Sequence, residues 1–213
     1  MARSLYLLMI SIFCVFSFSP PVFAKTNDEA NIKAKNEVVY ANLTAQGETE
    51  NVYVVNSFDV IKAGKLIDYG SYEAVKNLTN VTPIEQQGDK VVTEVEAGTF
   101  YYQGDLSSAE LPWKIEITYY LNGEEIAPEA LQGQSGKVEI RIDISENKQS
   151  NPSFFANYML QVTLPFAKER FTNITAEDAT FTNVGKEQQV TFTTLPNEAS
   201  TFSVSADVND FAF

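Results

Sequence analysis

WKIEITYYL at residues 113–121 and KVEIRIDI at residues 137–144 decide how this chain folds. In both segments apolar side chains alternate with polar ones. Successive side chains of a β-strand point to opposite faces, so the alternation predicts two strands that each bury one face. The side chains expected to point inward are Trp113, Ile115, Ile117, Tyr119, Leu121, Val138, Ile140, Ile142 and Ile144.

The residues between these strands contain turn and helix signals. Asn122-Gly123 suits a tight hairpin turn, because both residue types tolerate positive φ angles, and Glu124–Ile126 is expected to form a short return strand. Pro128 suits a first helical position and Gly133 a helix end, which predicts one helical turn between them. A second helical turn is expected over residues 72–78.

Strand patterns recur on both sides of this region, separated by turn residues. The further strands are expected at residues 37–43, 51–60, 84–87, 91–95, 98–103, 157–164, 171–175, 180–184, 188–195 and 201–211. Many short strands in succession are typical of an all-β sandwich or barrel. We therefore predict an all-β fold in which antiparallel hairpins precede an immunoglobulin-like β-sandwich, with one or two short helical turns.

The N-terminus has the three regions of a secretory signal peptide. Arg3 gives a positive start, residues 5–18 are almost wholly apolar, and Ala24 follows the helix-breaking Pro20-Pro21 pair. The expected organisation is a signal peptide over 1–24, a disordered lead-in over 25–36, a β-hairpin domain over 37–105 and the sandwich over 106–213. The alternative is an uncleaved N-terminal anchor, although the apolar run is shorter than a typical membrane span.

Composition excludes several functional classes. The formal net charge is −13, and no basic patch is visible, so nucleic acid is not an expected partner. The chain has no histidine, which removes every Ser-His and Cys-His nucleophile. The single cysteine, Cys14, lies in the predicted signal peptide, so the exported chain would hold no disulfide. This combination favours a bacterial exported protein.

Aromatic side chains are the candidate binding residues. Tyr102, Trp113 and Tyr120 lie on or beside predicted strands, and aromatic rings are enriched at protein interfaces and suit stacking on sugars. The expected partner is an extracellular protein or a cell-wall glycan. The alternative is that each outward ring packs against the other domain or the stem of a lysine.

Catalytic and metal-binding patterns are weak. Glycosidase chemistry needs two carboxyl groups across one cleft, and the pairs Glu94 with Glu96 and Glu116 with Glu139 have the residue types. Outward acids on sandwich strands are more simply explained as solvated surface. Ser135-Gly136-Lys137 has the residue types of a Ser-Lys dyad, but a turn before an exposed strand position explains the segment better. No run of calcium ligands occurs, so no catalytic residue, metal or cofactor is expected.

The last residues, Asn-Asp-Phe-Ala-Phe at 209–213, form an apolar end. One explanation is that both phenylalanines pack on the edge of the sandwich. The other is that the sequence is the front part of a longer protein. The pattern does not decide between them.

Two segments carry a resemblance to a known group of proteins. Residues 35–56, with Lys35-x-Glu-Val-Val-Tyr40 and Tyr53-Val-Val-Asn56, and residues 117–144 resemble the N-terminal extracellular region of uncharacterised Gram-positive surface proteins, which are loosely similar to phage-infection (Pip-like) heptad-repeat proteins. The resemblance implies β modules outside the cell, before a heptad-rich stalk and a membrane helix that this sequence lacks. Membrane attachment would then require a missing C-terminal anchor or an uncleaved signal.

The expected function is a non-enzymatic extracellular β module of a bacterial cell-surface protein, in an adhesive, spacer or accessory role. The first alternative is a secreted carbohydrate-binding module, which requires a flat strip of exposed aromatic rings. The second alternative is a hydrolase that works through carboxylates, which requires two acids in one cleft.

Overall fold

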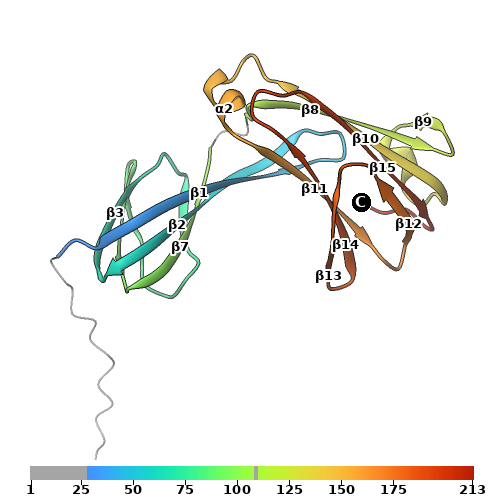
Figure 1. Cartoon of the computed structure of the whole chain (residues 1–213). Helices are drawn as coiled ribbons and strands as arrows, with labels where there is room; N and C mark the ends of the chain where they lie inside the picture. The colour runs from blue at the N-terminus through green and yellow to red at the C-terminus, as the bar shows by residue number, and fades with distance from the viewer. Residues whose placement is uncertain (1–27, 108–109) are drawn as a thin grey trace, which may run out of the picture.

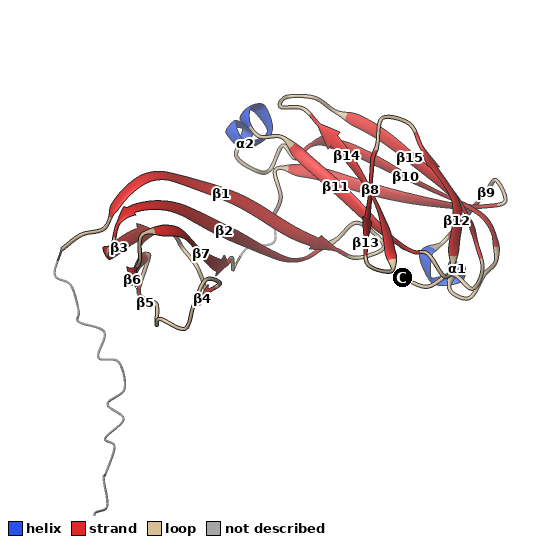
Figure 2. Ribbon diagram, turned by 60° about the horizontal axis from the view of Figure 1, so that its bottom comes forward, coloured by secondary structure: helices blue, strands red, loops and turns tan. Residues whose placement is uncertain are grey.

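The computed structural model describes residues 28–107 and 110–213, and the predicted signal peptide therefore lies outside the described residues. The described chain is all-β with antiparallel sheets and two short helices, as predicted (Figure 2). Its strands form two β-domains, one on each side of residue 107 (Figure 1). Within the described residues, neither helix is long enough to cross a membrane.

The first domain packs two sheets against each other. The larger sheet has the order β1-β2-β7-β4, with β1 at Asn31–Leu43, β2 at Thr49–Lys62, β7 at Gly98–Asp105 and β4 at Ala74–Asn77. The smaller sheet has the order β3-β6-β5, with β3 at Gly64–Tyr69, β6 at Lys90–Val95 and β5 at Glu85–Gln87. The buried residues between them are Phe58, Val60, Leu66, Val91, Val95, Phe100 and Tyr102.

The second domain also has two sheets. The five-stranded sheet has the order β12-β15-β10-β8-β9, with β12 at Phe171–Ala176, β15 at Ser200–Val208, β10 at Gly136–Glu146, β8 at Trp113–Leu121 and β9 at Glu124–Ile126. The three-stranded sheet has the order β11-β14-β13, with β11 at Leu160–Ala167, β14 at Glu187–Thr194 and β13 at Thr180–Val184. Helices α1 (Pro128–Leu131) and α2 (Pro152–Asn157) lie in connections between strands.

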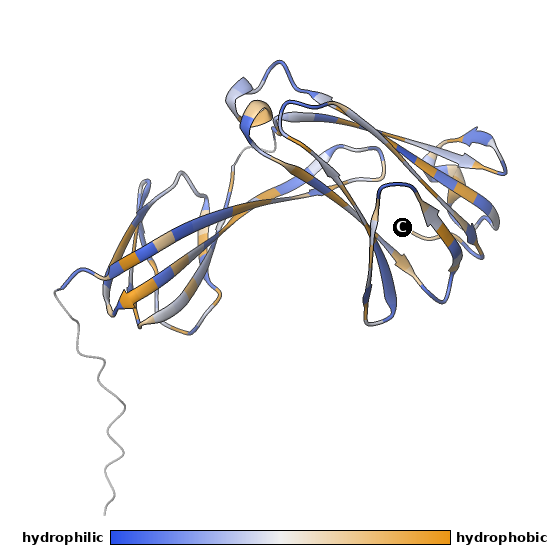
Figure 3. Cartoon of the chain, viewed as in Figure 1, coloured by the Kyte–Doolittle hydropathy of each residue, from blue (hydrophilic) through white to orange (hydrophobic). Residues whose placement is uncertain are grey.

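The register of the central strands matches the alternation in the sequence. On β10 the side chains of Val138, Ile140, Ile142 and Ile144 are all buried. Figure 3 shows apolar and polar residues alternating along these strands. Asn122 and Gly123 have φ angles of 54° and 89°, as a tight hairpin turn requires, and they join β8 to β9. The predicted helical turn after Pro128 is α1.

Two local predictions are wrong. Residues 31–36 belong to β1 and pair with β2, whereas the sequence predicted a disordered lead-in up to residue 36. Four of these six residues are polar, in an edge strand that is exposed along most of its length, and polarity alone does not distinguish such a strand from a disordered segment. The helical turn expected over 72–78 is instead the edge strand β4, paired with β7.

The β1–β2 hairpin reaches beyond the sheet to which it belongs. The paired positions run from Asn31–Lys62 at one end to Leu43–Thr49 at the other, whereas β7 pairs only with residues 53–60 of β2. The far part of the hairpin is therefore a two-stranded ribbon, and Figures 1 and 2 show it extending toward the second domain. This ribbon positions the site described next.

Candidate functional site

The tip of the β1–β2 hairpin contacts the second domain. The carbonyl of Ala45 accepts a hydrogen bond of 2.9 Å from the hydroxyl of Tyr119 on β8. The side chain of Gln46 donates one of 2.5 Å to the carboxylate of Glu129 in α1. Both bonds join residues more than 70 positions apart in the sequence. They hold the hairpin tip against the inner face of β8 and the start of α1.

Gly47 permits this close approach. Its φ angle is +88°, and a Cβ atom added there would lie 2.7 Å from the backbone carbonyl oxygen of Ile115. An L-residue is therefore disfavoured twice, by its backbone conformation and by a clash with a backbone atom. The sequence places residues 44–50 between two predicted strands, but nothing in the local pattern shows that this turn meets β8.

Tyr119 is the anchor of this junction. Its side chain is buried at the side of the second core, and burial raises the pKa of its phenol to about 12. The hydroxyl is therefore protonated at neutral pH and available as a donor to Ala45. Its ring also meets the ring of Phe213 edge-on at 5.6 Å, and Phe213 in turn contacts the buried Phe211. Phe211 thus packs on the sandwich, whereas Phe213 remains largely exposed.

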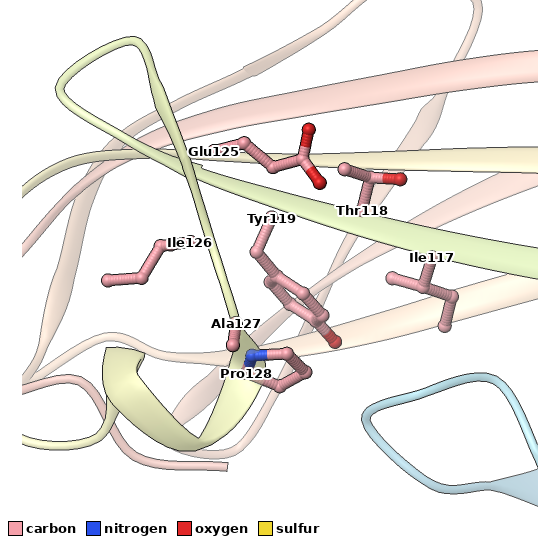
Figure 4. Close-up of a pocket in the computed structure, with 7 residues that line it drawn as sticks. All are labelled: Ile117, Thr118, Tyr119, Glu125, Ile126, Ala127 and Pro128. Carbon is pink, nitrogen blue, oxygen red and sulfur yellow. The ribbon is translucent and has the colours of Figure 1, made fainter.

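A hollow of about 300 Å³ lies beside the junction (Figure 4). It is lined by Ile117, Thr118, Tyr119, Glu125, Ile126, Ala127 and Pro128. A second hollow next to it shares Glu125 and adds Glu124. Because Glu124 and Glu125 are successive residues of β9, their side chains point to opposite faces of the strand. The two carboxylates are thus not arranged as an acid and base facing one substrate.

The three candidate binding residues do not form one surface. Tyr102 is completely buried in the first core, so its assignment to an exposed binding face is wrong. It lies opposite Asn56 on β2, and both point toward the smaller sheet, which leaves the exposed position to Tyr101. Trp113 is half-buried against the core of the second domain, and Tyr120 lies half-buried on the opposite face of the same strand.

Tyr120 lies on a polar surface. The outward face of the five-stranded sheet carries Glu139 opposite Tyr120, and Arg141 and Asp143 further along β10. The hydrogen bonds from Arg141 and Thr201 lower the pKa of the Asp143 carboxyl. This face is a solvated network of charges with one isolated ring, and it lacks the neighbouring aromatic rings that a sugar-stacking strip requires.

One of the two carboxylate pairs proposed from the sequence, Glu116 with Glu139, is also separated. Glu116 faces Asp143 in the β8–β10 ladder, and Glu139 is four residues away along β10, which is roughly 13 Å at the rise of a strand. Glu116 forms an ion pair with Lys114. Ser135 accepts a hydrogen bond from the backbone N–H of Asp210, so its hydroxyl holds the C-terminal segment. Its position matches the turn interpretation of that motif.

The first domain contains a polar cluster around the buried Asp68 and Tyr102 that the sequence did not predict. The hydroxyl of Tyr102 donates a hydrogen bond of 2.5 Å to Asp68, and the ammonium of Lys35 donates one of 2.7 Å to the other oxygen of that carboxylate. Lys35 also pairs with Glu37 at 2.6 Å. On the opposite side, Asn56 donates to the hydroxyl of Tyr72. These residues come from four strands and a loop, so no local motif could have revealed them.

The neighbouring carboxylates favour the charged form of Lys35 and the neutral form of Tyr102. Burial alone would lower the pKa of Lys35, but Asp68 and Glu37 outweigh that effect and raise it. Burial and the neighbouring carboxylate raise the pKa of Tyr102. Lys35 is therefore an ammonium and Tyr102 a neutral phenol at physiological pH. A charged lysine and a neutral tyrosine bridged by one carboxylate connect the two sheets and fix their spacing.

Within residues 28–107 and 110–213, no group of three or more histidine, cysteine, aspartate or glutamate side chains is arranged to hold a metal ion. Near the C-terminus, Asp207 accepts a hydrogen bond from Asn173, and Asp210 forms an ion pair with Arg170. No protein-family model and no curated protein sequence matches this chain.

Proposed function

We propose that this chain is a non-enzymatic extracellular β module of a bacterial cell-surface protein, and that it acts as a spacer that holds two β-domains in a fixed relative orientation. The observation that carries the proposal is the docked hairpin tip, at which Ala45, Gln46 and Gly47 of the first domain contact the second. A spacer must keep its two domains at a fixed distance and angle. A hairpin of one domain that also contacts the other domain restricts bending better than a single connecting chain does.

The surfaces of the second domain support the same proposal. The outward face of its five-stranded sheet is polar and charged, and its two hollows carry no facing pair of carboxylates. Export is supported by the signal-peptide pattern at residues 1–24. No arrangement of Tyr102, Trp113 and Tyr120 favours the carbohydrate-binding alternative over the spacer.

The rigid connection is tested by measuring the distance distribution between the domains. Spin labels placed by Lys76→Cys on β4 and Thr182→Cys on β13, in a Cys14→Ser background, lie on exposed strand positions of the two domains. We expect one narrow distribution for this protein. Gly47→Ala should broaden it, because the added Cβ displaces the tip from Ile115.

Gly123→Ala is the matched control. Gly123 has a φ angle of +89°, nearly that of Gly47, but a Cβ there would meet nothing within 4 Å. The control should therefore keep the narrow distribution. A broad distribution in the protein with Gly47 intact would contradict the spacer. The extracellular location is tested separately, by adding a protease to intact Gram-positive cells that express the chain, and protection from digestion would contradict it.

A further inference from the structure

Strand β1 leaves one long edge of the first domain open. It has 13 residues, and within the described chain its backbone pairs with β2 alone. An open edge presents unpaired backbone N–H and C=O groups that can pair with another strand. Proteins therefore protect open edges with short strands, prolines, bulges or charged side chains, and the degree of protection indicates whether an edge is free to bind.

Most other edges of the described chain carry such protection. The exception is residues 113–118 of β8, which β9 does not reach, although the hairpin tip at Gly47 lies against the carbonyl of Ile115 there. Strands β4, β5, β9 and β13 are only three to five residues long. Strand β11 contains Pro165, and the pairing of β12 is interrupted between Thr172 and Thr175. Strand β3 is covered by the segment before β1, through a bridge between Glu29 and Lys65. Each of these edges is too short, too irregular or too covered to extend its sheet by several residues.

Strand β1 is protected in its first part only. The pairing with β2 shifts register near Ile32, and Lys33 and Lys35 lie in this part of the strand. Residues 36–42 (Asn-Glu-Val-Val-Tyr-Ala-Asn) have regular pairing with β2, no proline and one charged side chain, Glu37. This less protected half of β1 is also its more apolar half.

The side chains of that half are exposed on both faces of the sheet. Val38, Val39 and Tyr40 have 50%, 54% and 45% of their surface exposed, which is high for apolar residues in the middle of a strand. Tyr40 stacks on Tyr53 of β2 with their rings 5.2 Å apart, so its ring is held in place. A regular, apolar and ordered edge is suited to accept another strand.

We propose that this edge binds the same edge of a second copy of the chain, and that the two β1 strands pair in antiparallel orientation about a two-fold axis at Val39. In that register Val39 faces Val39 of the second copy, Val38 faces Tyr40, Glu37 faces Ala41 and Asn36 faces Asn42. The three large exposed apolar side chains, Val38, Val39 and Tyr40, all face apolar ones, and no like charges are opposed. The two β1–β2–β7–β4 sheets become one continuous sheet with an isologous interface.

Neighbouring registers are less favourable. An axis at Val38 places Glu37 opposite Val39, and an axis at Tyr40 places Val38 opposite Asn42. An axis at Glu37 opposes two identical carboxylates. The sequence of this half strand thus complements itself about one position, which argues for a second copy over an unrelated extended peptide. Because the chain carries a net charge of −13, the association should strengthen as salt rises toward physiological ionic strength.

Sedimentation equilibrium of the purified protein tests the proposal. We expect a reversible monomer–dimer equilibrium that Val39→Lys weakens by roughly tenfold or more, because the substitution opposes two ammonium groups at the axis. Val81→Lys is the control, since Val81 is almost fully exposed in a loop away from this edge and the change adds the same charge. A wild-type chain that remains monomeric, or a dimer that Val39→Lys leaves unchanged, would overturn the proposal.

A cross-link tests the register, and it also decides the question should Val39→Lys fail to fold. In a Cys14→Ser background, Val39→Cys places two thiols directly opposite each other, so mild oxidation should give a disulfide-linked dimer. Val184→Cys is the control, because Val184 is similarly exposed on the edge strand β13. Equal yields from Val39→Cys and Val184→Cys would show that the thiols meet only by random collision, and the proposal would then be wrong.

Discussion

The two domains of this chain each pack two sheets around a core, but the side chains in the two cores differ in kind. The buried cluster of the second domain has 14 residues, and only Tyr119 among them carries a hydroxyl, which donates to a backbone carbonyl. That of the first domain has 7, and one of them, Tyr102, is bonded through its hydroxyl to a carboxylate. Asp68, Asn56 and Thr93 are buried beside them. The second domain is held by the amount of apolar surface that it buries, whereas the first depends on a few polar side chains that must meet in one geometry.

This difference explains how the domains depend on each other. Sequestering apolar area is non-directional and tolerates small displacements, whereas hydrogen bonds between buried groups do not. The first domain uses two of its strands for a ribbon that leaves its own sheet, and the tip of that ribbon is held by the second domain at Tyr119. We therefore expect substitutions to act strongly but separately in the two cores, and weakly at the junction between them.

The largest effect is expected for Ile140→Asp. Ile140 is buried in the middle of β10, so the substitution places an unpaired carboxylate in an apolar core and should cost about 4 kcal/mol or more. The fluorescence of Trp113, the only tryptophan, reports the unfolding of the second domain. Ser203→Asp is the control, because it adds the same charge on the outward face opposite Arg141. Unchanged cooperative melting of Ile140→Asp would show that the assigned register is wrong.

The next largest effect is expected in the first domain for Asp68→Ala. Removing this carboxylate leaves the buried hydroxyl of Tyr102 and the ammonium of Lys35 without their shared acceptor, at a cost of about 2–3 kcal/mol. Urea unfolding followed by circular dichroism measures the loss, and the tryptophan transition of the second domain should not move. Asp59→Ala removes a more exposed partner of Lys33 and should cost less than about 1 kcal/mol. Equal losses for the two variants would contradict the structural role of the buried cluster.

Alkaline pH should lower the stability of the first domain, by less than the Asp68→Ala substitution does. The pKa values of Lys35 and Tyr102 are raised in the folded state, so the stability that these groups contribute is complete below their unfolded values of 10.5 and 10.0. It is lost as pH rises further, because the unfolded chain then releases protons that the folded chain retains. The urea midpoint of the first domain should be constant from pH 7 to 9 and fall by pH 11. If the urea midpoint of the Tyr102→Phe variant fell by the same amount, the loss of stability would be due to groups other than Tyr102.

The smallest effect is expected at the junction. Tyr119→Phe removes one hydrogen bond to the carbonyl of Ala45 and should cost about 0.5–1.5 kcal/mol. Burial raises the pKa of Tyr119 to about 12, so the protein with Tyr119 should lose folding stability as the pH rises from 10 to 12. The Tyr119→Phe variant should lose less stability over the same range. Tyr120→Phe, one residue along on the outward face, is the matched control. A larger loss in the control would contradict the assignment of Tyr119 as the anchor.

The sequence was informative wherever burial repeats with the period of a strand. The register of β8 and β10, the Asn122-Gly123 turn and helix α1 could be predicted because each depends on neighbouring residues. Prediction failed for residues 31–36 of β1 and for β4, which are parts of edge strands. An edge strand is paired on one side only and is largely exposed, so its composition resembles that of a loop.

The assignment of Tyr102 failed for a related reason. Tyr101 and Tyr102 are adjacent, and alternation requires that one points inward without indicating which one. The pairing of β7 with β2, which places Tyr102 opposite the buried Asn56, decides the matter. Nothing local to either residue contains that information.

The sequence by itself determined that this protein is built from antiparallel strands and where the core of its second domain lies, because side-chain alternation is a local property. Only the tertiary structure decided that Asp68 bridges Lys35 and Tyr102, that Gly47 lies against Ile115, and that the second half of β1 remains an open edge. Each of these features joins, or leaves apart, segments that are distant in sequence. Their geometry is fixed by how whole sheets pack, which no short pattern of residues records.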